Sequence, residues 1–309
     1  MNKQILVLTA FLTLQIALAG ILFFNDSNVM SSVESRLLVE VNSKKLNKIS
    51  ITEGDETLSL IKENERWQLE NHPEITLVNS KVDAIANQLA NTQVSWPVTS
   101  TENSHERFKV SANDFEKQVE FTDSDGNKQT LLLGKSPSFK QLYARNLADN
   151  DVYSIEYSAY QVNIDPDSWF DKSMLSIDSI KEINHSVINL TKNEESWQLA
   201  PPSALDKKQA LDESSVEDLV NQLTNLSVSG IAKKTPTATN TLTVKNEQNT
   251  KYVFSFAEDE ESYFVKREDI NQWFTLAKPK YEALANLSLD KFVLEEEQLE
   301  EEEADVTSE

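Results

Sequence analysis

Residues 58–69 read LSLIKENERWQL, and residues 188–199 read INLTKNEESWQL. The two stretches align without gaps and share Leu, Lys, Glu, Trp, Gln and Leu at matched places. Apolar residues alternate around both, as at Leu58 and Leu60, which is typical of short antiparallel strands. Because self-similarity within a chain indicates a repeated structural unit, we expect a duplicated module.

A second pair of matching segments follows the first pair. Residues 80–95 (SKVDAIANQLANTQVS) align with residues 214–229 (SSVEDLVNQLTNLSVS). Ser80 and Ser214 each precede an acidic residue by three positions, and this capping-box pattern predicts that a helix begins at each serine. One apolar helical face recurs in each segment, formed by Val82, Ile85, Ala86 and Leu89 and by Val216, Leu219, Val220 and Leu223.

Further strands are expected after each helix. Residues 119–121 and 130–133 flank the turn Asp123 to Asn127, whose Asp-Gly pair predicts a hairpin. A later strand pair, residues 143–145 and 152–155, corresponds to residues 264–266 and 273–276. The expected fold class is α+β: an N-terminal transmembrane helix followed by two tandem homologous modules of antiparallel strands with packed helices.

The matched tryptophans, Trp67 and Trp197, are expected to anchor the two cores, because aromatic residues at strand spacing are usually buried. A ligand-stacking role is the alternative.

Residues 5–24 (ILVLTAFLTLQIALAGILFF) carry no charge, and twenty residues in a helix span about 30 Å, the thickness of a bilayer core. Lys3 precedes this segment and Asp26 follows it, so the positive-inside preference places the N-terminus in the cytoplasm. A cleaved signal peptide ending at Ala17-Leu18-Ala19 is one alternative, and a buried helix is another. Against cleavage, the apolar run 21–24 would be left at the new N-terminus.

The composition excludes several classes of protein. The net charge is −22, and nine acidic residues between Glu295 and Glu309 account for part of it, which leaves about −13 on the remainder. A body of this sign repels phosphate, so no nucleic-acid partner is expected, and anionic lipid headgroups would be repelled too. The chain has no cysteine, and its five glycines form no phosphate-binding loop.

No catalytic, cofactor-binding or metal-binding residues are assigned, and no cofactor is expected. His72, His105 and His185 have no second ligand at metal-binding spacing, so we expect them on the surface or in loops. The turn at Asp123 lacks two ligands of a calcium loop, since Phe121 and Leu132 occupy those positions. A plain turn is the better interpretation.

The expected domain organisation has six parts. They are a cytoplasmic tip (1–4), the transmembrane helix (5–24), a stalk (25–45), α+β repeat 1 (46–177), α+β repeat 2 (178–293) and an acidic disordered tail (294–309). A docking role for the tail is the alternative to a solvated one.

The chain resembles the bacterial domain-of-unknown-function family 4340. The residues that carry the resemblance are Trp67-Gln-Leu69, the helix from Ser80, Leu131-Leu-Leu-Gly134, Tyr143-Ala-Arg145, Val152-Tyr153 and Trp169-Phe170-Asp171-Lys172. The second copy departs from this pattern, with Ser255 expected to match Gly134, and with Phe264 and Lys266 matching Tyr143 and Arg145. The resemblance implies a membrane anchor, a repeated module and a place beside ABC-transporter permeases of the gliding-motility type. It supplies no catalytic residues.

The expected function is therefore a non-enzymatic, membrane-anchored accessory or binding protein in an ABC-transporter or cell-envelope complex. Its partners would be the membrane, through the N-terminal helix, and other proteins. It would be a single-pass protein of the bacterial cytoplasmic (inner) membrane, with its N-terminus inside and its body periplasmic or otherwise extracytoplasmic. An envelope hydrolase or glycan-binding enzyme that uses carboxylates between the modules is an alternative, and a structural spacer is another.

Overall fold

The computed structural model describes residues 12–18, 21, 35–194, 196–201 and 209–295. Residues 12–18 and 21 are helical, with exposed apolar side chains such as Leu14 and Ile16. Within the described ranges, no helix is both long enough and apolar enough to cross a membrane. Most of the predicted span 5–24 lies outside the described residues, as do the tip 1–4, much of the stalk and the tail from residue 296.

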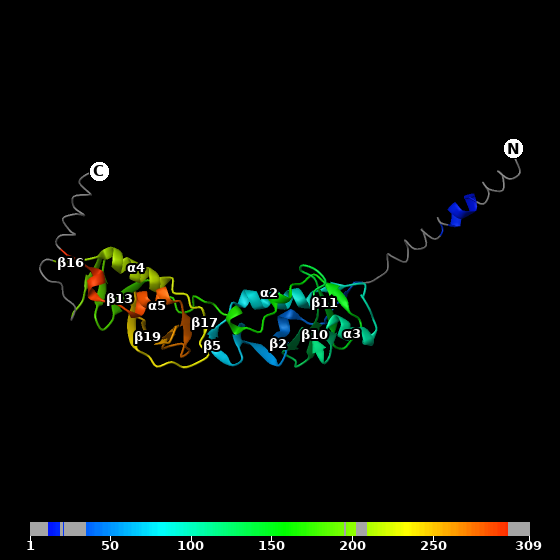
Figure 1. Ribbon diagram of the computed structural model, residues 1–309, viewed down its shortest axis with the longest axis horizontal. Helices are drawn as coiled ribbons and strands as arrows, with labels where there is room; N and C mark the ends of the chain where they lie inside the picture. Colours follow the sequence, from blue (N-terminus) through cyan, green and yellow to red (C-terminus); the bar gives the residue numbers. More distant parts are fainter. Residues whose placement is uncertain (1–11, 19–20, 22–34, 195, 202–208, 296–309) are drawn as a thin grey trace. The chain divides into compact units, whose positions relative to one another are not determined.

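The described chain is α+β, with mostly antiparallel sheets and a few helices, as the sequence predicts at this level (Figure 1). The first large sheet has eight strands. Their order is β12 (Tyr153–Ile155), β11 (Leu142–Asn146), β10 (Lys128–Leu133), β9 (Lys117–Asp123), β2 (Leu46–Glu53), β3 (Glu56–Glu63), β4 (Arg66–Leu69) and β5 (His72–Thr76).

The second large sheet also has eight strands. Their order is β17 (Gly230–Ile231), β21 (Phe274–Leu276), β20 (Ser262–Arg267), β19 (Lys251–Asp259), β18 (Asn240–Asn246), β13 (Ile180–Asn184), β14 (Asn189–Asn193) and β15 (Ser196–Leu199).

Seven strands follow the same order in both sheets. The run β12-β11-β10-β9-β2-β3-β4 corresponds to β21-β20-β19-β18-β13-β14-β15, and each strand also keeps its place along the chain. The registers agree too, since Leu133 pairs with Ala144 where Phe256 pairs with Val265. These registers place Ala257 at the position of Gly134, so the expected match with Ser255 is wrong by two residues.

Smaller elements complete the fold. Three two-stranded sheets pair β1 (Arg36–Leu37) with β6 (Gln93–Val94), β7 (Val110–Ser111) with β8 (Asp114–Phe115), and β16 (Gln209–Leu211) with β22 (Val293–Glu295). The helices are α2 (Asn79–Ala90), α3 (His105–Phe108), α4 (Glu213–Thr224) and α5 (Lys278–Ala285). The 3-10 helices are η1 (Ser43–Lys45), η2 (Glu102–Ser104), η3 (Ala159–Gln161), η4 (Pro166–Ser168) and η5 (Leu289–Phe292).

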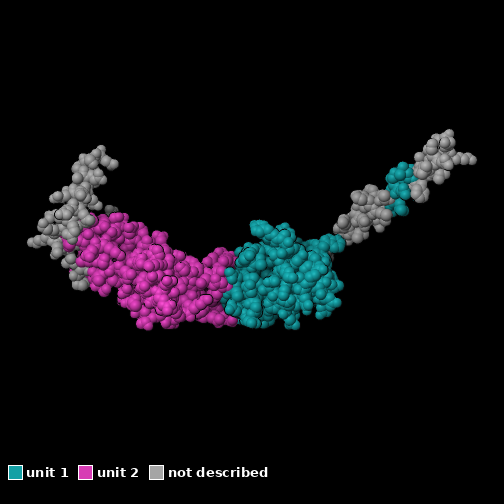
Figure 2. Space-filling view, viewed as in Figure 1, with its two compact units in different colours: residues 1–59, 82–164 teal, residues 60–81, 165–309 magenta. Residues whose placement is uncertain are grey.

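The chain divides into two compact units (Figure 2). The first contains residues 1–59 and 82–164, and the second contains residues 60–81 and 165–309. In the first unit Leu38 and Val39 are buried, so the folded body begins before residue 46. The domain boundaries proposed from the sequence stay a prediction.

Apolar residues at strand and helix spacing form the cores, as predicted. Trp67 and Trp197 are both buried, which confirms their packing role. The predicted face of α2 is buried in full, whereas Val220 of α4 is half-buried. In the second unit, α4 packs against α5, and α5 contacts β18 and β20.

The predicted helix starts need correction. Helix α4 begins at Glu213, and its N-cap is Asp212, whose carboxylate accepts hydrogen bonds from the backbone N–H groups of Ser214 and Ser215. Helix α2 begins at Asn79, so Ser80 lies inside the helix. For α4 the capping-box pattern identified the wrong N-cap, because Asp212, two residues before Ser214, is also a good N-cap and occupies that position.

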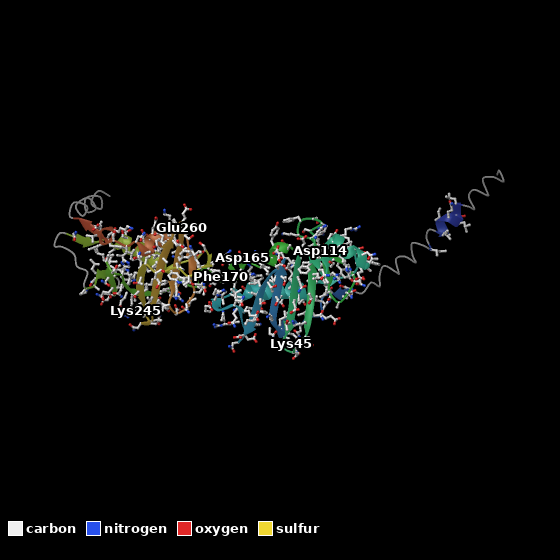
Figure 3. The ribbon with its side chains drawn as sticks, turned by 60° about the horizontal axis from the view of Figure 1, so that its bottom comes forward. Lys45, Asp114, Asp165, Phe170, Lys245 and Glu260 are labelled. Atoms are coloured by element: carbon white, nitrogen blue, oxygen red, sulfur yellow. The ribbon has the colours of Figure 1, made fainter. Side chains whose placement is uncertain are left out.

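The turn at Asp123 is the expected hairpin. The Asp123 carboxylate accepts hydrogen bonds from the side-chain amide of Asn127 and from the N–H groups of Asn127 and Asp125, and these bonds hold its pKa below the ordinary value. Gly126 has a φ of 84°, which explains the glycine. Lys45 pairs with Asp125 at 2.7 Å. Figure 3 shows Lys45 at the opposite end of the sheet from Asp114.

We expect Asp212→Ala to lower the free energy of unfolding by about 1 kcal/mol, the usual loss for an N-cap. The reason is that two N–H groups of α4 lose their acceptor. Denaturant unfolding measures the change, and Ser214→Ala is the matched control with a smaller expected effect. A larger loss for Ser214→Ala would contradict the cap assignment.

Candidate functional site

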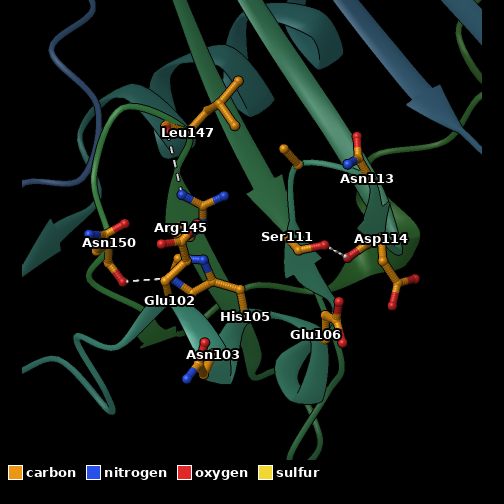
Figure 4. Close-up of a pocket in the computed structure, with 11 residues that line it drawn as sticks. Glu102, Asn103, His105, Glu106, Ser111, Asn113, Asp114, Arg145, Leu147 and Asn150 are labelled. Carbon is orange, nitrogen blue, oxygen red and sulfur yellow. Dashed lines mark hydrogen bonds between the residues drawn. The ribbon is translucent and has the colours of Figure 1, made fainter.

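A polar cavity of about 870 Å³ lies in the first unit, beside the end of β11. This volume falls within the roughly 300–1,000 Å³ that small-molecule sites occupy. Charged and polar side chains dominate its wall (Figure 4). The lining residues are Glu102, Asn103, His105, Glu106, Ser111, Ala112, Asn113, Asp114, Arg145, Leu147 and Asn150.

One wall of the cavity is the helical segment η2–α3. Helix α3 ends at Phe108, and its C-cap Lys109 has a φ of 57°, in the left-handed region that terminates many helices. The chain then enters β7, and Phe108 and Val110 are buried in a cluster with Leu132 and Val152. This apolar contact fixes the wall on the sheet.

Gly134 allows the same wall to approach the sheet closely. A Cβ at this position would lie 2.1 Å from the backbone oxygen of Phe108 and 2.8 Å from that of Lys109. Backbone atoms cannot move aside as a flexible side chain can, so any larger residue would displace the segment. The N–H of Lys135 also donates to Phe108 O at 3.0 Å, which ties the wall to the end of β10.

Arg145 is the central charged residue of the cavity. The residue is only 4% exposed, and its Nε donates to Val110 O at 2.7 Å. Its Nη1 donates to Asp149 O at 2.7 Å and to Leu147 O at 3.3 Å. Burial lowers the pKa of Arg145, although a guanidinium stays charged in proteins. Among the described residues, Nη2 has no acceptor and the side chain has no carboxylate partner.

His105 also lines the cavity and is 4% exposed. Its Nε2 lies 2.9 Å from the backbone oxygen of Asn150. A carbonyl oxygen only accepts, so Nε2 carries the proton and donates this bond. The expectation that all three histidines lie on the surface or in loops is therefore wrong for His105, which is a buried helix residue.

Three carboxylates lie around these two side chains. Asp114 accepts a hydrogen bond from Lys109 Nζ at 2.6 Å, and this bond raises the pKa of Lys109. Glu102 and Glu106 come from the helical wall. The cavity therefore offers both positive and negative groups to a ligand.

The loop after β11 connects the cavity to Arg36. The Arg36 guanidinium forms salt bridges with Asp149 and Asp151, and it donates to the Tyr153 hydroxyl at 2.7 Å. These contacts raise the pKa of Arg36 further above its already high value. The backbone of Asp149 binds Arg145 while its side chain binds Arg36. One loop thus holds a cavity residue and the chain that follows the predicted anchor.

The corresponding place in the second sheet is built differently. The strand registers put Lys266 at the position of Arg145, and Lys266 Nζ donates to Asn271 Oδ1 at 2.8 Å. The buried arginine there is Arg267, which pairs with both carboxylate oxygens of Asp269 at 2.7 and 3.0 Å. A buried guanidinium that contacts backbone oxygens, with the carboxylates of Asp149 and Glu102 near it but not in a direct ion pair, is thus a feature of the first half.

The arrangement is suited to binding. Within the described ranges, no group of three or more His, Asp or Glu side chains is placed to hold a metal ion. Backbone carbonyls, and not a nucleophile or an acid–base partner, hold both Arg145 and His105. A guanidinium with a free donor favours a ligand that presents an acceptor such as a carboxylate or carbonyl oxygen.

A family model described as a domain of unknown function (DUF4340) matches residues 67–246, which is more than half of the chain. The chain belongs to the DUF4340 family. No curated protein and no solved structure matches the chain. Arg145 and Gly134, both among the residues that carried the resemblance, lie within the matched range of the DUF4340 model.

We expect Arg145→Leu to lower the free energy of unfolding by about 3 kcal/mol or more, since three carbonyls would lose a donor at about 1 kcal/mol each or more. Denaturant unfolding measures this loss. Lys266→Leu, at the matching position of the second sheet, should change stability by less than half as much. Equal losses in the two variants would contradict the central role of Arg145.

The Arg36–Asp149 contact predicts a specific acid dependence. Burial raises the pKa of Asp149, but hydrogen bonds from Arg36 and from backbone N–H groups together hold it below the ordinary value. A lowered folded-state pKa stabilises the fold above the unfolded-state pKa of about 4, and this stability disappears as the pH falls through the folded-state pKa. Between about pH 5 and 2, unfolding free energy should therefore fall more steeply for the wild type than for Asp149→Asn.

Denaturant unfolding at several pH values tests this dependence. Arg36→Met is the matched variant and should flatten the profile in the same way, because it removes the partner of the carboxylate. If Asp149→Asn gave a profile parallel to that of the wild type, the contact would not stabilise the fold.

Proposed function

We propose that this DUF4340 protein is a non-catalytic binding subunit of an ABC-transporter or cell-envelope complex. The cavity around Arg145 carries the proposal, because its buried guanidinium is fixed by backbone carbonyls and leaves the N–H groups of Nη2 for a ligand. Such a preorganised polar site binds with little loss of side-chain entropy. The partner would present an acceptor group to Arg145.

The proposed protein is anchored by residues 5–24 in the bacterial inner membrane, with the body on the periplasmic side. The uncharged run of twenty residues supports the anchor, and Lys3 before it with Asp26 after it supports the orientation. The Arg36 contacts would then join the anchor to the loop that borders the cavity.

The two halves are proposed to be tandem homologous modules. The shared order of seven strands and the matched Trp-Gln-Leu segments support a duplication. The halves have diverged around Arg145 and Lys266, so we assign ligand binding to the first module and a spacing or docking role to the second.

Co-purification of the full chain in a mild detergent tests this function. We expect permease or ATPase subunits of a transporter to accompany the tagged chain, and its mass should show that residues 5–24 are retained. Exchange of residues 5–24 for an unrelated membrane helix is the control that separates contacts of the anchor from contacts of the body.

Recovery of the chain alone under these conditions would contradict the accessory role. Normal function after deletion of either half would favour a spacer. Turnover of an envelope glycan that is lost on replacing Glu102, Glu106 or Asp114 would instead favour a hydrolase.

A further inference from the structure

A second cavity, of about 520 Å³, lies elsewhere in the first unit. It is formed by α2, by the turn at residues 138–141 and by the segment that follows β12. None of its residues lines the cavity around Arg145. The lining residues are Gln88, Phe139, Lys140, Gln141, Glu156, Tyr157, Ser158 and Gln161.

Tyr157 lines this cavity with part of its side chain, but its hydroxyl is buried and does not face the cavity. The residue is 2% exposed, and among the described residues its buried hydroxyl has no hydrogen-bond partner. Burial also raises the pKa of Tyr157, so the hydroxyl keeps its proton. Buried hydroxyl groups in folded proteins are normally paired, so this one is an exception, and because its oxygen has almost no accessible surface a ligand in the cavity does not reach it.

The other polar groups of the wall are mostly neutral amides. Gln88, Gln141 and Gln161 each carry two donors and one acceptor, and Ser158 adds a hydroxyl. Gln141 Oε1 accepts a hydrogen bond from Ser138 Oγ at 2.9 Å, which orients its amide. Amides that both donate and accept complement a ligand whose groups do the same, and the hydroxyls of a sugar are such groups.

An exposed aromatic ring stands at this cavity. Phe139 is 87% exposed, although it lines the cavity, and it lies in the short turn closed by the bridge between Ser138 and Gln141. Lys140 has a φ of 56°, and its Nζ lies 5.3 Å from the centre of the Phe139 ring. A large apolar ring beside polar groups offers a surface for the apolar face of a ligand ring.

The charges of the wall nearly cancel. Lys140 is its one cationic side chain and Glu156 its one carboxylate among the lining residues. Such a wall does not select a strongly charged ligand. We propose that this cavity is a binding site for a neutral carbohydrate, with Phe139 under a sugar ring and the three glutamines on its hydroxyls. This site does not depend on the proposed transporter role.

Titration of the full chain with diacetylchitobiose, cellobiose and maltose tests the proposal. The detergent must lack a sugar headgroup, because a glycoside detergent would compete. We expect saturable binding of at least one disaccharide, measured by calorimetry or by saturation-transfer NMR, and at least about tenfold weaker binding in Phe139→Ala and in Gln161→Ala, the loss expected for one good contact.

Trp96→Ala is the matched control, because Trp96 is also an exposed aromatic residue of the first unit but does not line the cavity. Absence of binding by all three disaccharides up to about 10 mM, about ten times the dissociation constant of a weak 1 mM site, would overturn the proposal. Equal affinity in the wild type and Phe139→Ala would also overturn it. Both results are distinct from a failure of transporter subunits to co-purify.

Discussion

The hydrogen bonds of Arg145 hold together the part of the first unit that carries the candidate site. One guanidinium joins the wall after α3, through Val110 O, to the loop after β11, through Leu147 O and Asp149 O. A buried guanidinium that lost these acceptors would be strongly destabilising, so the wall and the loop are constrained to one arrangement. His105 adds a fourth tie, from α3 to Asn150 O, and it closes the same loop from the other side.

This constraint also reaches the chain on the far side of the loop. Asp149 accepts from Arg145 with its backbone oxygen and from Arg36 with its side chain. A ligand that moved the loop to reach the free Nη2 of Arg145 would therefore also change the position of the Asp149 carboxylate. This movement would reach Arg36 directly, because Asp149 contacts both arginines. A binding event in the cavity is in this way physically connected to the segment that follows the proposed anchor.

Local patterns explain why most of the fold could be predicted from the sequence. Alternation found the strands that contain Ile49, Ile51 and Trp67, and the Asp-Gly turn found the β9–β10 hairpin, because each signal lies within a few residues. The helix starts were less accurate, since Asp212 and Ser214 are both good caps and only the backbone decides between them. The match of Gly134 with Ser255 was wrong because the two copies have diverged in sequence here. The register of this strand is fixed by its pairing with the neighbouring strand, which the sequence does not show.

The candidate site was much harder to find, because it depends on burial that no local pattern reports. His105 and Asn150 are far apart in sequence, and the residues next to His105 do not distinguish it from a surface histidine. Arg145 was noted only as a residue that carries the family resemblance and that Lys266 replaces in the second copy, with no role in a site. One signal was available in retrospect: Gly134 ends an apolar strand in a chain with five glycines, and such a glycine often marks the close approach of another backbone segment.

The difference between the two halves is the strongest reason to place ligand binding in the first. A duplicated scaffold has no structural need to keep a guanidinium without a carboxylate, because Arg267 shows that the same sheet order accommodates a buried arginine paired with Asp269. Burial of an unpaired charge is unfavourable, and nearby carboxylates are usually recruited to offset it. The first half instead directs Arg145 to backbone oxygens and leaves one nitrogen toward a cavity. This arrangement makes the fold less stable than an ion pair would. A role of Nη2 in ligand binding would explain why the first half has it.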